Sequence, residues 1–191
     1  MSDIVALNLA VIVGSTRSGR IGPLVAAWLA DRAGGHDDLN VDLIDLAEAG
    51  LPSDLDASSP QVTAVAPRLA RADAFVVVTP EYNHSFPAPL KTAIDCFRTE
   101  WQAKPVGFVS YGGMAGGLRA VEQLRQVFAE THTVGVRDTV SFHNVWEQLG
   151  EQGQFPVEPA GCDAAAKTML DQLVWWARTL RTGRQAHPYS I

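Results

Sequence analysis

Residues 74–83 of the 191-residue chain read AFVVVTPEYN, and this stretch decides the fold. Its apolar run, residues 75–78, contains no polar side chain, and Pro80 follows shortly after. A strand that is apolar on both sides is typical of a parallel sheet with helices on both faces. The stretch therefore predicts a central buried strand that ends in a loop of polar and aromatic residues.

Strand-like and helical segments alternate on both sides of this stretch. Strands are predicted at residues 6–13, 39–46, 74–79, 105–111 and 134–142. Helices are predicted at residues 23–33, 61–71, 89–99, 118–130 and 164–180, with a loop over residues 47–60. This alternation predicts an α/β fold. We expect a flavodoxin-like three-layer sandwich, whose five-stranded parallel sheet has the order 2-1-3-4-5 and helices on both faces; a Rossmann variant fits the same alternation.

Length and composition set the broad class. The 191 residues suggest a single domain over residues 1–191, and 47% hydrophobic with 19% charged residues is ordinary for a globular protein. The formal net charge of −6 argues against nucleic-acid binding, which depends on neutralising phosphates. Cys96 and Cys162 form no CxxC pair, which fits a reducing compartment. No apolar stretch approaches the roughly 18 residues of a membrane span, so we expect a cytoplasmic protein without a membrane partner.

The loop after the first predicted strand, residues 14–20, reads GSTRSGR and directly precedes a helix. Its glycines permit a tight turn, and its hydroxyls and amides can donate to phosphate oxygens. Positive charge comes from the helix N-terminus and from Arg17 and Arg20. The loop therefore predicts an anion site, with an ordinary polar turn as the alternative.

The kind of phosphate follows from what this loop lacks. It is not GxGxxG, so the dinucleotide fingerprint is absent. Gly14 and Gly19 have Walker A spacing, but Arg20-Ile21 stands where Lys-Ser/Thr is required. Because the hydroxyl that would ligate magnesium is missing, a terminal monophosphate fits better than nucleoside triphosphate hydrolysis.

Two more loops follow the third and fourth predicted strands. Residues 80–89, PEYNHSFPAP, combine three stiffening prolines with aromatic and amide groups suited to a flat heterocycle. Residues 111–117, YGGMAGG, contain four glycines that let a ligand approach the backbone. The alternatives are a plain rigid loop and simple loop flexibility. In a sheet of the expected order these loops converge on the switch point, where ligands bind. The role of His84 stays open.

Motifs of other chemistries are absent from the sequence. It contains no HExxH, no clustered Cys/His set and no GxSxG elbow. We therefore predict no metal ligand.

Three segments together resemble one family. In order, residues 14–20 (GSTRSGR), 80–95 (PEYNHSFPAPLKTAID) and 104–125 (KPVGFVSYGGMAGGLRAVEQLR) are similar to the NADPH-dependent FMN reductases, which include flavin-dependent quinone, azo and chromate reductases. The resemblance covers about residues 11–125, with a weaker similarity in the closing helix. It implies a flavodoxin-like fold, non-covalent FMN, and a homodimer or homotetramer with a contact at residues 90–97.

The resemblance also implies site residues. The first loop would hold the phosphate, the second would lie against the isoalloxazine, and the glycine loop would pass its pyrimidine edge. The cofactor-binding residues are then Ser15, Arg17, Ser18, Gly19, Arg20, Ile21, Pro80, Glu81, Tyr82, Asn83, Tyr111, Gly112 and Gly113. Many members have Ser and Asn where this chain has Arg20 and Gly22, but Arg20 brings charge to the same turn.

These observations predict an FMN-dependent oxidoreductase. NADPH would be the co-substrate, and hydride would pass to bound FMN and then to a small-molecule acceptor by a ping-pong mechanism. The acceptor would be a flavin, a quinone, an azo or nitro compound, or a metal oxyanion. FMN carries the hydride chemistry, so no catalytic side chain is predicted. The alternatives are a non-catalytic, flavodoxin-like electron carrier and a non-redox module that binds a nucleotide or phosphosugar.

Overall fold

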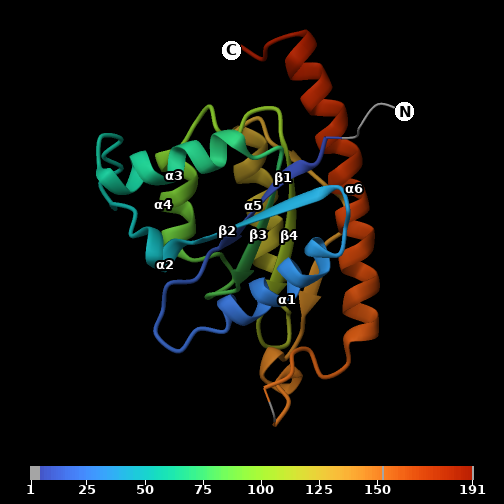
Figure 1. Cartoon of the computed structure of the whole chain (residues 1–191). Helices are drawn as coiled ribbons and strands as arrows, with labels where there is room; N and C mark the ends of the chain where they lie inside the picture. Colours follow the sequence, from blue (N-terminus) through green and yellow to red (C-terminus); the bar gives the residue numbers. More distant parts are fainter. Residues whose placement is uncertain (1–4, 152, 191) are drawn as a thin grey trace.

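The computed structural model describes residues 5–151 and 153–190 (Figure 1). The strands are β1 (Leu7–Val13), β2 (Leu39–Asp45), β3 (Ala74–Pro80), β4 (Pro105–Tyr111), β5 (Val134–Gly135) and β6 (Val140–Phe142). The helices are α1 (Gly22–Gly34), α2 (Leu46–Ala49), α3 (Pro60–Arg71), α4 (Ala88–Cys96), α5 (Leu118–Glu130) and α6 (Pro159–Ala186), with a 3₁₀ turn η1 (Val145–Gln148).

The strands form one parallel sheet with β3 in its middle. Their order is β2-β1-β3-β4-β5, and β6 also pairs with β4. This confirms the predicted flavodoxin-like order. β3 is buried along all seven of its residues, as expected of a strand that is covered on both faces.

Helices cover both faces of the sheet (Figure 1). α1 and α6 pack on one face, against Leu9 and Val11 of β1. α3, α4 and α5 pack on the other face, against Ala10 and Ile12 of the same strand. Because successive side chains of a strand point to opposite faces, each central strand contributes to both cores.

An aromatic cluster fixes the end of α4. Trp101 lies edge-on to Phe75, Phe97 and Phe128, with ring centroids 4.8, 6.3 and 5.6 Å away. Phe97 has extended backbone angles, and these direct its buried ring toward Trp101. The helix therefore ends at Cys96, three residues before its predicted end.

The fifth predicted strand, residues 134–142, is interrupted. Gly135 of β5 lies opposite Val106, whereas Val140 of β6 lies opposite Val109, so two extra residues bulge out between the two pieces. Within the bulge the N–H of Asp138 donates to the side chain of Gln172 on α6 (3.2 Å). A single unbroken strand was therefore the wrong prediction, because contacts with a distant helix determine this segment.

Two other segments differ from prediction by more than one residue. The predicted loop over residues 47–60 begins inside α2, which is capped by the Asp45 carboxylate accepting from the N–H of Ala47 (3.0 Å) and ends at Gly50 with φ of 57°. α6 spans 28 residues and extends past both predicted ends.

In the part of the chain that the structure describes, no helix combines the length and apolar character needed to cross a membrane.

Because both faces of the sheet are tightly packed, we expect truncation of a buried side chain to lower the free energy of unfolding strongly. Phe108 of β4 is fully buried and lies 5.9 Å from the ring of Phe128. We expect Phe108→Ala to lower the free energy of unfolding by about 3–5 kcal/mol in urea titrations, because it removes a whole buried ring. Leu43→Ala, at a side chain that is 40% exposed, is the control and should cost under about 1 kcal/mol. Equal costs for the two variants would contradict this packing.

Candidate functional site

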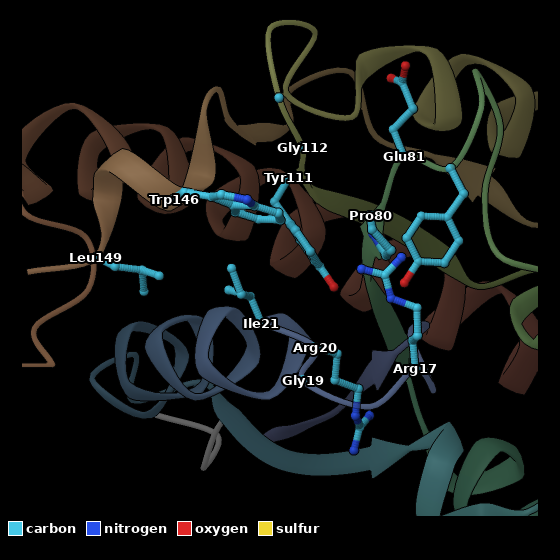
Figure 2. Close-up of a pocket in the computed structure, with 12 residues that line it drawn as sticks. Arg17, Gly19, Arg20, Ile21, Pro80, Glu81, Tyr111, Gly112, Trp146 and Leu149 are labelled. Atoms are coloured by element: carbon cyan, nitrogen blue, oxygen red, sulfur yellow. The ribbon is translucent and has the colours of Figure 1, made fainter.

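The loops after β1, β3 and β4 meet at the carboxyl edge of the sheet. The N–H of Gly14 donates to the carbonyl of Val78 (2.8 Å), and the N–H of Glu81 donates to that of Tyr111 (3.2 Å). A cavity of about 600 Å³ opens between the loops (Figure 2), which is an ordinary size for a small-molecule site. It is lined by Arg17, Gly19, Arg20, Ile21, Pro80, Glu81, Tyr82, Tyr111, Gly112, Gly113, Trp146 and Leu149.

Ten of these twelve lining residues are among the predicted cofactor residues. Three predicted residues, Ser15, Ser18 and Asn83, do not line the cavity. Ser15 is fully buried behind the wall, whereas Ser18 and Asn83 are exposed in the loops beside it.

Arg20 forms hydrogen bonds with other residues of the protein. Its guanidinium forms two hydrogen bonds with the carboxylate of Asp45 (2.6 and 2.8 Å) and donates to the carbonyl of Ser15 (2.6 Å). The bonds with Asp45 raise the pKa of Arg20 above its usual value. Figure 2 shows the side chain directed away from Trp146 and Tyr111. The main contact of Arg20 therefore ties the first loop to the end of β2, and Asp45 balances its charge.

Arg17 has no such partner. Its side chain is exposed, and its guanidinium carbon lies 5.5 Å from the centre of the Tyr82 ring. Among the described residues, no carboxylate lies within ion-pair distance of it. α1 begins just beyond, and no side chain caps its N-terminus at Ile21. An uncompensated arginine beside an uncapped helix N-terminus is favourable for an anion.

Close contacts explain why residue 22, the first residue of α1, is a glycine. A Cβ on Gly22 would lie 2.4 Å from the Ser15 hydroxyl oxygen and 2.9 Å from that of Tyr111. Burial raises the pKa of Tyr111 to about 12, so its hydroxyl stays protonated and donates to Ser15 Oγ (3.0 Å). The expected phosphate-binding hydroxyl of Ser15 is thus part of a buried contact between β4 and the first loop.

The second loop is a tight hairpin turn. Tyr82 and Ser85 exchange backbone hydrogen bonds (2.8 and 3.1 Å), and Asn83 and His84 between them have φ of 51° and 69°. Two positive φ angles in a two-residue hairpin are characteristic of a type I′ turn. The side chain of His84 is exposed on this turn and does not line the cavity.

Side chains of α5 hold this turn in place. The Glu81 carboxylate accepts from the guanidinium (2.7 Å) and the backbone N–H (3.2 Å) of Arg119. The amide of Gln123 donates to the carbonyl of His84 (2.9 Å) and accepts from the hydroxyl of Ser85 (2.6 Å). The loop is therefore held by contacts within the protein.

The glycine loop is fastened to the segment after β6. The N–H groups of Asn144 and Val145 donate to the carbonyls of Gly113 and Gly112, both at 2.9 Å. A Cβ on Gly113 would meet no atom within 4 Å, so the loop leaves open space on that side. The hydrogen bonds from Asn144 and Val145 argue against loop flexibility as the reason for the glycines.

Trp146 and Leu149 are the lining residues that the sequence analysis missed. They lie on and just after η1, beyond the end of β6. A tryptophan among polar residues after a strand that pairs with β4 was an available signal, because parallel strands end at the same edge. The sequence analysis placed the end of this strand correctly at Phe142 but assigned no function to the residues that follow it.

Comparisons with known proteins agree with this geometry. A model of the NADPH-dependent FMN reductase family matches residues 7–147. An NAD(P)H-dependent FMN reductase of Schizosaccharomyces pombe is 38% identical over 130 residues, which are 63% of this chain and 64% of the yeast protein. A 2-hydroxy-1,4-benzoquinone reductase of a Burkholderia species is 36% identical over 137 residues, 69% of this chain and 70% of that protein.

Solved structures show the same architecture. FerB, described as a flavoenzyme NAD(P)H:(acceptor) oxidoreductase from Paracoccus denitrificans, superposes with a TM-score of 0.71 at 25% identity, over 91% of this chain and 98% of its own. A flavodoxin from Pseudomonas aeruginosa, with a TM-score of 0.57 and 16% identity over 90% of this chain and 99% of its own, shares the fold. Because the family match includes all three loops and the sheet that carries them, the chain belongs to the NADPH-dependent FMN reductase family.

Proposed function

We propose that this chain binds one FMN non-covalently in the cavity and uses it to pass electrons from NADPH to a small-molecule acceptor. Family membership gives the reaction class, an oxidoreductase that depends on FMN and NAD(P)H. The observation that carries the proposal is the position of the anion site. Arg17 and the uncapped N-terminus of α1 lie at one part of a 600 Å³ cavity whose other walls are Pro80 and the glycine loop.

The residues present fit the parts of FMN. Arg17 and the positive N-terminal end of the α1 dipole would attract the phosphate, while Arg20 keeps the loop in shape through Asp45. Pro80 and Tyr82 would lie along the flat ring. Among the described residues the N–H of Gly113 has no acceptor, so it can donate to an oxygen or nitrogen at the ring edge. A fixed donor at that position would favour negative charge on the ring.

The protein's role in the reaction is to orient the bound molecules and to exclude competing reactions. Bound FMN supplies the hydride and electron chemistry. A single cavity then serves NADPH and the acceptor in turn, because both must reach the same ring. This arrangement predicts ping-pong kinetics, with parallel lines in double-reciprocal plots of rate against NADPH at several acceptor concentrations.

The absorption spectrum tests the proposal. Purified protein that is mixed with FMN and desalted should keep a flavin band, and anaerobic NADPH or NADH should bleach it. A retained band that neither donor bleaches would favour an electron carrier. Loss of all flavin on desalting would mean that the cavity takes another ligand.

The two arginines of the first loop should behave differently. Arg17→Ala should raise the FMN dissociation constant by about 10- to 100-fold, the value of a charge-assisted hydrogen bond, with little change in the unfolding temperature of the flavin-free protein. Arg20→Ala should lower that temperature, because it leaves the largely buried Asp45 carboxylate without its ion-pair partner. Flavin fluorescence titration and thermal unfolding of both variants measure the two effects. Unchanged FMN affinity in Arg17→Ala would remove Arg17 from the site.

The open space beside Gly113 gives a third test. Gly113→Val should raise the FMN dissociation constant about tenfold or more, because its side chain enters space that the ring would need. Its unfolding temperature should stay near that of the wild type, since a Cβ there meets no atom. Gly161→Ala, in open space on α6, is the control and should leave FMN affinity unchanged. Normal affinity in Gly113→Val would place the ring elsewhere.

A further inference from the structure

The cavity has two sides of different chemistry. One side presents Arg17 and the backbone around Gly19. The other presents three apolar side chains, Ile21, Trp146 and Leu149. Figure 2 shows Trp146 beside Tyr111, with Ile21 and Leu149 on the same side and Arg17 opposite. The proposed phosphate and ring-edge contacts use the first side and the glycine loop, so they leave this apolar wall without a role.

Trp146 is exposed but firmly positioned. Its side chain is 65% exposed, whereas the preceding residue, Val145, is fully buried in the core. Asn144 has a φ of 44°, which turns the chain at this point, and both Asn144 and Val145 bond to the glycine loop. His143 adds a hydrogen bond between its Nδ1 and the carbonyl of Met114 (2.7 Å). The exposure of the indole is therefore imposed by an anchored backbone.

Among the described residues, the indole of Trp146 lacks the hydrogen bonds and aromatic contacts of two other tryptophans. Trp28 and Trp101 donate their indole N–H groups to Asp163 and to the carbonyl of Ile94, and both lie edge-to-face with core phenylalanines. Within residues 5–151 and 153–190, Trp146 makes no corresponding hydrogen bond or aromatic contact. A large apolar ring fixed at the edge of a ligand cavity is suited to contact with a ligand.

We propose that Trp146 is the specificity-determining residue for the electron acceptor, and that it favours flat aromatic acceptors of the quinone class. This inference rests on the proposed function. The indole would stack on the acceptor, with Ile21 and Leu149 completing the apolar wall. In the overall reaction NADPH, one proton and a quinone give NADP⁺ and a hydroquinone, so the quinone gains two electrons and two protons. Ferricyanide, a small inorganic anion, would gain nothing from the indole.

Steady-state kinetics and equilibrium binding test this role. In Trp146→Ala, the KM for 1,4-naphthoquinone should rise roughly tenfold, the value of a lost aromatic contact. The dissociation constant of 1,4-naphthoquinone from the oxidised, FMN-loaded protein should rise equally; it is measured without NADPH from the change in the flavin spectrum. The KM for ferricyanide and the FMN dissociation constant should stay within about twofold of the wild type. Trp146→Phe should restore most of the naphthoquinone affinity, because it keeps a ring.

Trp175 provides a matched control. Its side chain is 61% exposed on α6, and it does not line the cavity. Trp175→Ala should leave all four constants unchanged. Wild-type naphthoquinone constants in Trp146→Ala would overturn the inference, and so would an increase in the FMN dissociation constant with equal losses for both acceptors. Failure of the wild-type protein to retain FMN or to be reduced by NADPH would instead overturn the proposed function, and the inference with it.

Discussion

The structure depends on the burial of β3 between two parallel neighbours. A strand without water on either face must satisfy its peptide groups within the sheet, so β1 and β4 have to flank it along its length. Their registers with β3 bring the ends of all three strands to one edge. This constraint places three loops that are distant in sequence around one cavity. The location of the site therefore follows from the packing of the sheet.

The loops themselves are held by polar contacts with neighbouring elements. Arg20 bonds to Asp45 at the end of β2, Glu81 bonds to Arg119 on α5, and the glycine loop bonds to the segment after β6. Each contact joins one of the three loops to a different segment of the chain. The entropy of ordering these loops is thus lost during folding, which leaves less to lose when a ligand binds.

Much of the fold was predictable because its signals are local. The boundaries of β4 and α5 match the prediction, since an apolar run and an amphipathic face each lie within one segment. The break between β5 and β6 was not predictable in this way, because it involves Gln172 on a distant helix. At the site, the sequence predicted the loops that surround the cavity, but not which of their side chains form hydrogen bonds with other parts of the fold. Ser15 and Arg20 are engaged by Tyr111 and Asp45, both far away in the chain.

The contacts of Gln123 have a consequence for how the site is supported. Gln123 is an exposed residue on the outer side of α5, yet its amide holds the turn at His84 and Ser85, 39 and 38 residues earlier in the chain. That turn keeps two non-glycine residues at positive φ, a conformation that costs of order 1–3 kcal/mol at each and persists only with such support. Support for the wall of the cavity at Tyr82 therefore comes in part from an exposed helix residue that does not itself line the cavity.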